Sequence, residues 1–151
     1  MIIEFKGMRP DVEKATFIAD SAMLSGDSHL AENPPAWFGA SVRAEVASIS
    51  IGRDSNVQDN AIVHGATIED DVTVGMHATV MNGAVIGAGS MVAAGALVKE
   101  RSVIPPCSLV VGVPGKVIRT LDAQTVARNI EHSQEAYIAD AQEYARARMV
   151  G

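Results

Sequence analysis

Branched apolar residues recur along this chain at every sixth position, with a single step of five before Ile68. An amphipathic helix repeats its apolar face every three or four residues and a strand alternates every two, so neither gives this spacing. Parallel strands that stack into a solenoid, a β-helix, do give it. The repeated positions are Ile51, Val57, Val63, Ile68, Val74, Val80, Ile86, Val92, Val98, Ile104 and Val110, and an earlier run holds Val12, Ile18, Leu24 and Leu30.

Small residues accompany the branched ones at fixed distances. Gly52 directly follows Ile51, for example, and Ser55 comes four positions after it. Three hexapeptides, roughly eighteen residues, would form one triangular coil, and successive coils would stack about 4.8 Å apart. A β-sandwich with coincidental spacing is the alternative, but the agreement of so many positions favours the solenoid. We therefore expect an all-β solenoid with the branched side chains inside.

The repeat is interrupted in one region of the chain. Glu32–Ala36 reads ENPPA and is expected to form a bulge at a corner, and Ala44–Ser50 also lacks the spacing. We therefore assign residues 1–120 to the β-helix, with an irregular part at 31–50.

From Leu121 the pattern changes to that of an amphipathic helix. Asp122 is its expected N-cap. We assign residues 121–151 to this helix and expect it to pack along the outside of the prism. Its apolar face is marked by Val126, Ile130, Tyr137 and Tyr144.

Composition narrows the function classes. Hydrophobic residues make up 48% of the 151 residues but aromatic residues only 4%, which suits a narrow interior of aliphatic side chains. The net charge of −6 argues against a nucleic-acid partner. One cysteine, Cys107, cannot form an internal disulfide and favours a reducing, cytoplasmic compartment. The first residues, MIIEFKGM, lack the pattern of a signal peptide, and no apolar run could span a bilayer, so no membrane partner is expected.

Four stretches of the chain carry a likeness to a known family. They are WFGASVRAE (37–45), IGRDSNVQDNAIVHG (51–65), VTVGMHATVMNGAVIG (72–87) and SLVVGVPGKVIRTL (108–121). Together they resemble the γ-class carbonic anhydrase group of left-handed β-helix proteins. The last stretch is shared with hexapeptide acyltransferases, whereas the second is much more specific.

The resemblance implies a left-handed parallel β-helix that assembles as a homotrimer, with a metal site at each subunit interface. Three histidines, two from one chain and one from its neighbour, would bind zinc or another divalent ion. The implied reaction is hydration of CO2 to bicarbonate by a metal-bound hydroxide, a lyase activity. A bound divalent cation lowers the pKa of water to about 7, which supplies this nucleophile at neutral pH.

Five residues correspond to the site of that family. Arg43 matches its arginine, and Glu45 stands where the family has aspartate. Gln58 and Asp59 match its Gln-Asp pair, and His64 matches its first histidine. The resemblance implies that His64 binds the metal and that Arg43 organises the carboxylates. Gln58 and Asp59 would orient water and substrate.

One coil of the family pattern has no counterpart here. That coil reads like VTIGHxAxLHGC and supplies the two further histidines. The segment after His64 resembles instead the one that follows the family's third histidine, so about one coil is absent. Met76 and Met81 stand in the two histidine slots. His77 is displaced by one position, so it is a metal ligand only if it reaches a neighbouring subunit.

Three functions stay open at this point. The first is metal-dependent CO2 hydration at an incomplete or rearranged site. The second is a non-catalytic trimeric scaffold or assembly protein, in which Arg43, Glu45 and Asp59 form an interface network. The third is an acyltransferase with an acyl-CoA donor, because Ser90–Val98 and Ser108–Leu121 resemble that branch.

Overall fold

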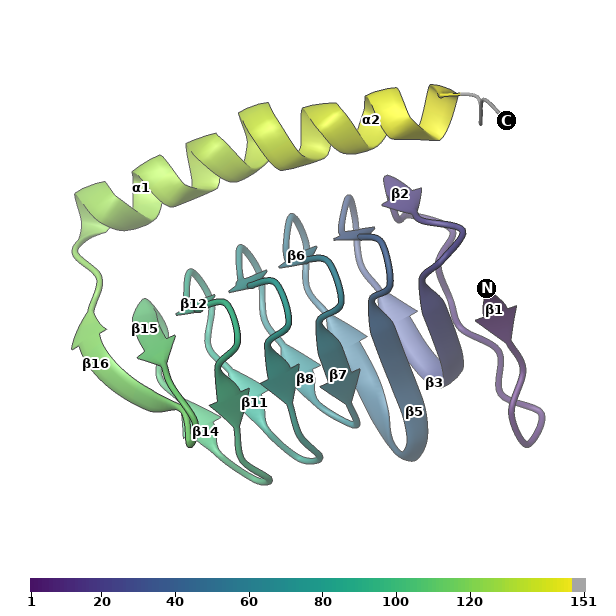
Figure 1. Ribbon diagram of the computed structural model, residues 1–151, viewed down its shortest axis with the longest axis horizontal. Coiled ribbons are helices and arrows are strands. Elements are labelled where there is room, and N and C mark those ends of the chain that lie inside the picture. The colour runs from purple at the N-terminus through teal and green to yellow at the C-terminus, as the bar shows by residue number, and fades with distance from the viewer. Residues whose placement is uncertain (148–151) are drawn as a thin grey trace.

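A computed structural model describes residues 1–147 as a parallel β-helix of about six turns with one helical segment alongside (Figure 1). The predicted all-β solenoid, a left-handed parallel β-helix of hexapeptide repeats, is thereby confirmed. The solenoid has three faces, numbered here in chain order. The first corner joins the first and second faces, the second corner joins the second and third, and the third corner joins the third face to the first.

Each face is a ladder of short strands from successive coils. The first face holds β1 (Ile2–Ile3), β3 (Met23–Leu30), β5 (Ser41–Ile51), β7 (Ile62–His64), β10 (Thr79–Val80) and β13 (Leu97–Val98). The second face holds the ends of β3 and β5, then β8 (Thr67–Ile68), β11 (Val85–Ile86) and β14 (Val103–Ile104). Since β3 and β5 run through the first corner, these two faces form one nine-stranded sheet.

The third face is a separate seven-stranded sheet. It holds β2 (Phe17–Ile18), β4 (Pro35–Ala36), β6 (Asn56–Val57), β9 (Thr73–Val74), β12 (Met91–Val92), β15 (Ser108–Val111) and β16 (Lys116–Thr120). The last strand is antiparallel to β15, and β1 lies parallel to β3 at the other end. Both ends of the solenoid therefore have a covering strand, which limits the unpaired edge.

The six-residue repeat sets the core. Val63 pairs with Val80, and Val80 pairs with Val98, so equivalent branched side chains stack in one interior column. Every repeated position from Ile51 to Val110 is buried, with at most 8% of the residue exposed. The small residues are buried as well, and Ser55 shows why: its hydroxyl donates to Glu69 O at 2.7 Å and accepts from Val72 N at 3.0 Å.

The region predicted to be irregular contains a long strand. The prolines of ENPPA are buried, and the second of them begins β4. Strand β5 continues through Ala44–Ser48, where the sequence shows no repeat, and leaves Val46 78% exposed. Gly26 of the preceding coil allows this, because a Cβ there would lie 2.3 Å from Ala44 O.

The helical segment lies along the third face (Figure 1). It comprises α1 (Ala123–His132), a π-helical turn η1 (Ser133–Ile138) and α2 (Ala139–Arg146). Asp122 is its N-cap, as predicted, and accepts from Thr125 N at 2.8 Å. These bonds to Thr125 lower the pKa of the Asp122 carboxyl. No described helix is long and apolar enough to cross a membrane.

Aromatic side chains fasten the far end of this helix to the solenoid. Tyr144 of α2 lies 5.2 Å from Phe38 and 5.7 Å from Phe17, measured between ring centroids. Trp37 lies 5.9 Å from Tyr144, and its Nε1 donates to Asn56 Oδ1 at 2.7 Å. The interior of the prism contains no rings among these, so the few aromatic residues serve the contact between helix and sheet.

Candidate functional site

Arg43 and His64 form a direct contact at the first corner. They are register partners in the parallel pair β5 and β7, so their side chains stand side by side. Arg43 Nη2 lies 3.2 Å from His64 Nε2. A guanidinium has no lone pair to offer, so it donates and the imidazole nitrogen accepts. Neutral His64 therefore carries its proton on Nδ1.

Glu45 completes this cluster. Its Oε2 lies 3.8 Å from Arg43 Nη2, and the two side chains are 36% and 44% exposed. An ion pair with that exposure contributes little to stability, about 0–1 kcal/mol. It does hold the guanidinium over the corner, between a carboxylate and an imidazole.

Gln58 and Asp59 lie at the other edge of the same face. They form the third corner that leads into β7, whereas His64 ends that strand. Three extended residues span ~10 Å, so one protomer does not bring the two groups together. Gln58 is 5% exposed, and its Nε2 has no hydrogen-bond partner among the described residues. Buried polar groups nearly always have a partner, which points to a group outside this protomer.

His77 belongs to this third corner too. Its backbone has φ 57°, and its N–H donates to Asp59 O at 2.9 Å. The equivalent turn positions in neighbouring coils are Asn60, with φ 54°, and Gly95, with φ 70°. His77 is thus an exposed turn residue in the left-handed region, which explains why it stands one position away from the slot predicted for a ligand.

The described residues do not fit a three-histidine metal centre. Among residues 1–147, no three His, Cys, Asp or Glu side chains come together in a group that could hold a metal ion. The Nε2 lone pair of His64 accepts from a cationic group, which opposes a second cation there. On its other side the next ladder position is Met81, a soft thioether that suits zinc poorly.

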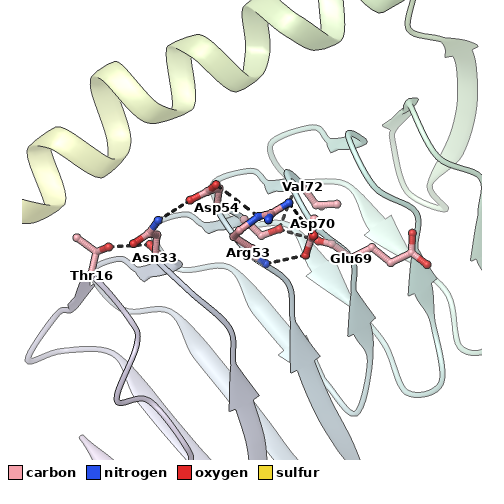
Figure 2. Close-up of polar contacts among 8 residues, drawn as sticks. Thr16, Asn33, Arg53, Asp54, Glu69, Asp70 and Val72 are labelled. Atoms are coloured by element: carbon pink, nitrogen blue, oxygen red, sulfur yellow. Dashed lines mark hydrogen bonds and ion pairs between the residues drawn. The ribbon is translucent and has the colours of Figure 1, made fainter.

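A second polar network runs along the second corner, and the sequence analysis did not find it (Figure 2). Asn33 Nδ2 donates to Asp54 Oδ1 at 2.8 Å, and Arg53 Nη2 lies 3.3 Å from Asp70 Oδ2. Asp70 also accepts from Arg53 N at 2.8 Å. These carboxylates are occupied in linking one coil to the next, so the network is structural. A D-D or R-D pair at equivalent corners of successive coils is the sequence signal for it.

The family model "Bacterial transferase hexapeptide (six repeats)" matches residues 65–100. A Methanocaldococcus jannaschii protein named "Probable carbonic anhydrase" is 40% identical over 149 positions, covering 84% of this chain and 93% of that one. The "Carbonic anhydrase" of Geobacillus kaustophilus is 34% identical, with 95% and 91% covered. "Gamma carbonic anhydrase 2, mitochondrial" of Arabidopsis thaliana is 34% identical, with 90% of this chain covered. The chain belongs to the γ-class carbonic anhydrase family. It spans 59% of the length of the Arabidopsis relative.

The solved structures agree on the fold of this γ-class chain. A hexapeptide transferase family protein from Anaplasma phagocytophilum superposes with a TM-score of 0.74 at 28% identity, covering 95% of this chain and 98% of that one.

The alignment also bears on the absent coil. It runs over 149 positions with the Methanocaldococcus protein, yet only 84% of the 151 residues of this chain take part. That relative therefore has more residues in the aligned region than this chain, by about one coil.

Proposed function

We propose that this protein is a γ-carbonic-anhydrase-like homotrimer that binds bicarbonate at its subunit interfaces without a resident zinc ion. The observation that carries this proposal is the contact between Arg43 and His64. It presents a partly exposed guanidinium beside an imidazole whose accepting nitrogen is already engaged. A guanidinium recognises planar oxyanions through two parallel N–H donors, and bicarbonate has that shape.

A homotrimer supplies the rest of the site. Gln58 and Asp59 lie across the first face from His64, so only a second protomer could set them beside it. The unpartnered Nε2 of Gln58 is a further donor for an oxyanion held there. In this proposal Arg43 and Gln58 hold the anion, Glu45 orients Arg43, and Asp59 orients bound water. The single cysteine supports a cytoplasmic location.

Catalysis of CO2 hydration is the family activity that this chain is not expected to perform. The family's reaction uses a metal-bound hydroxide, and the donor set described above does not fit the metal. The expected rate in a stopped-flow CO2-hydration assay is that of the buffer, with or without added zinc. A rate well above buffer that disappears with a chelator would overturn this part of the proposal and restore the first of the three functions.

Bicarbonate binding is tested by titration calorimetry on matched variants. Arg43→Ala is expected to abolish the binding seen in the unmodified protein. Arg128→Ala removes an exposed arginine on α1, far from the first corner, and is expected to change nothing. Equal binding by the two variants would contradict the assigned site.

The acyltransferase alternative has one supporting observation, the fold shared with hexapeptide transferases. Against it, the described solenoid carries no long loop with a histidine, and its most extended corner is Ala44–Ser48. Titration with acetyl-CoA tests it directly. Saturable binding would favour the transferase, and its absence would remove this alternative.

A further inference from the structure

Met81 is the direct ladder neighbour of His64. Val63 and Val80 are register partners, so the residues that follow them continue the same column at the edge of the first corner. Arg43 is the partner of His64 on the opposite side. The imidazole therefore has a guanidinium one strand away in one direction and a thioether one strand away in the other, each about 4.8 Å along the solenoid.

Neither neighbour can help His64 to bind a divalent ion. The guanidinium offers only donors, and the thioether is a soft ligand that selects monovalent copper over zinc. A single imidazole binds zinc weakly, since stable zinc sites use three or four nitrogen, sulfur or oxygen ligands. The backbone is not the obstacle, because parallel neighbours at this spacing direct their side chains to the same side of the sheet.

Met76 occupies the matching place at the third corner. It is 50% exposed and directly precedes His77. A methionine with half its surface in solvent contributes little to the core of its own protomer. In the proposed homotrimer this corner faces the first corner of the adjacent protomer, so Met76 would approach His64 and Met81 of that neighbour.

We infer that Met76 and Met81 are the residues that keep a divalent metal out of this interface, and that the interface is otherwise arranged to hold one. This inference rests on the proposed homotrimer. Replacing Met81 by histidine puts two imidazoles on adjacent strands of one protomer, close enough to share an ion. Replacing Met76 as well adds a third from the neighbour and leaves one position open for water.

The test is a gain of zinc binding. Chelator-treated protein is titrated with Zn²⁺ by calorimetry, and metal content is measured after gel filtration. Met81→His alone is expected to bind zinc measurably, and Met76→His with Met81→His is expected to bind it with a Kd about 100-fold lower than the unmodified protein. Met91→His is the matched control, because Met91 pairs with Thr73 and Leu109 on the third face and has no histidine beside it.

The variants separate this inference from the proposed function. Adding His64→Ala to the double variant is expected to abolish the gain. The inference is overturned if the double variant binds zinc no more tightly than Met91→His, or if the unmodified protein binds zinc as tightly as the double variant. A gain with Met81→His that Met76→His does not increase would support the role of Met81 and count against the homotrimer. Far-UV circular dichroism confirms that each variant is folded.

Discussion

At the residue scale, His64 receives its hydrogen bond from a side chain that can only donate. Its neutral form is therefore the Nδ1 tautomer, and its Nε2 lone pair is engaged with Arg43 rather than free for a ligand. This one contact decides between two readings of the same residue. The sequence makes His64 a candidate ligand, whereas the geometry makes it the acceptor of an arginine.

Asp71 supplies a prediction at this scale. Burial, with repulsion from Asp54, raises the pKa of its carboxyl above the ordinary 3.8. The folded protein thus holds this proton more tightly than the unfolded chain, so the associated stability is present at pH below 3.8 and is lost as pH rises through the folded-state pKa. Asp71→Asn is expected to raise the free energy of unfolding at pH 7 by up to about 0.5 kcal/mol, a small gain because the group is largely solvated.

Urea unfolding at pH 7 and pH 3.5 checks this expectation. The gain should vanish at the lower pH, where the carboxyl is already neutral, and a gain of equal size at both would contradict it. Asparagine also tolerates the left-handed backbone at this position, where φ is 58°. Asp70→Ala is the control. It removes the acceptor for two Arg53 donors and is expected to destabilise by about 1 kcal/mol.

The limits of sequence reasoning are also visible residue by residue. The six-residue spacing placed Val63 and Val80 in register, and from this the neighbours of His64 followed correctly. The contact with Arg43 depends on the path of β5 through the first corner, which carries no repeat. The left-handed turn at His77 depends on its corner position, which a count of residues from Gly75 does not reveal.

At the element scale, close stacking of the coils makes some glycines indispensable. A Cβ on Gly52 would lie 2.5 Å from Asp70 N, a backbone atom of the next coil. Gly95 has nothing within 4 Å of the same position, although its φ is +70°. Gly52→Ala is therefore expected to cost about 3 kcal/mol through overpacking.

Gly95→Ala is its matched control. It introduces only the backbone strain of a left-handed alanine, about 1 kcal/mol. Thermal unfolding of both variants gives the comparison. Equal losses would show that the coils can move apart to admit a methyl group, contrary to the contact distances.

The helical segment gives a second prediction at this scale. Tyr144 joins α2 to the solenoid through Phe17 and Phe38, so Tyr144→Ala is expected to cost about 1 kcal/mol beyond its buried area and to loosen α2 first. Amide hydrogen exchange should increase in Ala139–Arg146 while β9 and β12 keep their protection. Arg146→Ala, which removes only an exposed pair with Glu143, is expected to leave exchange unchanged.

The sequence predicted this helix and its N-cap but not its most buried residues. Ile138 and Ala141 are 8% and 0% exposed, although the predicted face ran through Tyr137 and Tyr144. The π-helical turn explains the difference, because it places more residues in one turn and rotates the face that follows. A turn of this kind is set by tertiary packing and leaves no periodic signal in the sequence.

At the scale of the whole molecule, the proposed homotrimer does not depend on metal. Its expected mass in solution is three times 15.8 kDa, before and after dialysis against a chelator. The midpoint of thermal unfolding should also stay constant, because a bound ion stabilises a protein only when it binds the folded state. A fall in mass or in the midpoint after chelation would show a resident metal, and His64→Ala should then give the same fall.

The helix along the third face also acts as a ruler for the solenoid. It is held at one end by Val126, which packs over Gly89, and at the other by the rings around Trp37. The place where this chain lacks a coil, directly after His64, lies between those two anchor points. One coil adds about 4.8 Å to the solenoid, and an α-helix covers that distance with about three residues. A relative with one more coil in this interval therefore needs about one more turn of helix to keep both anchors.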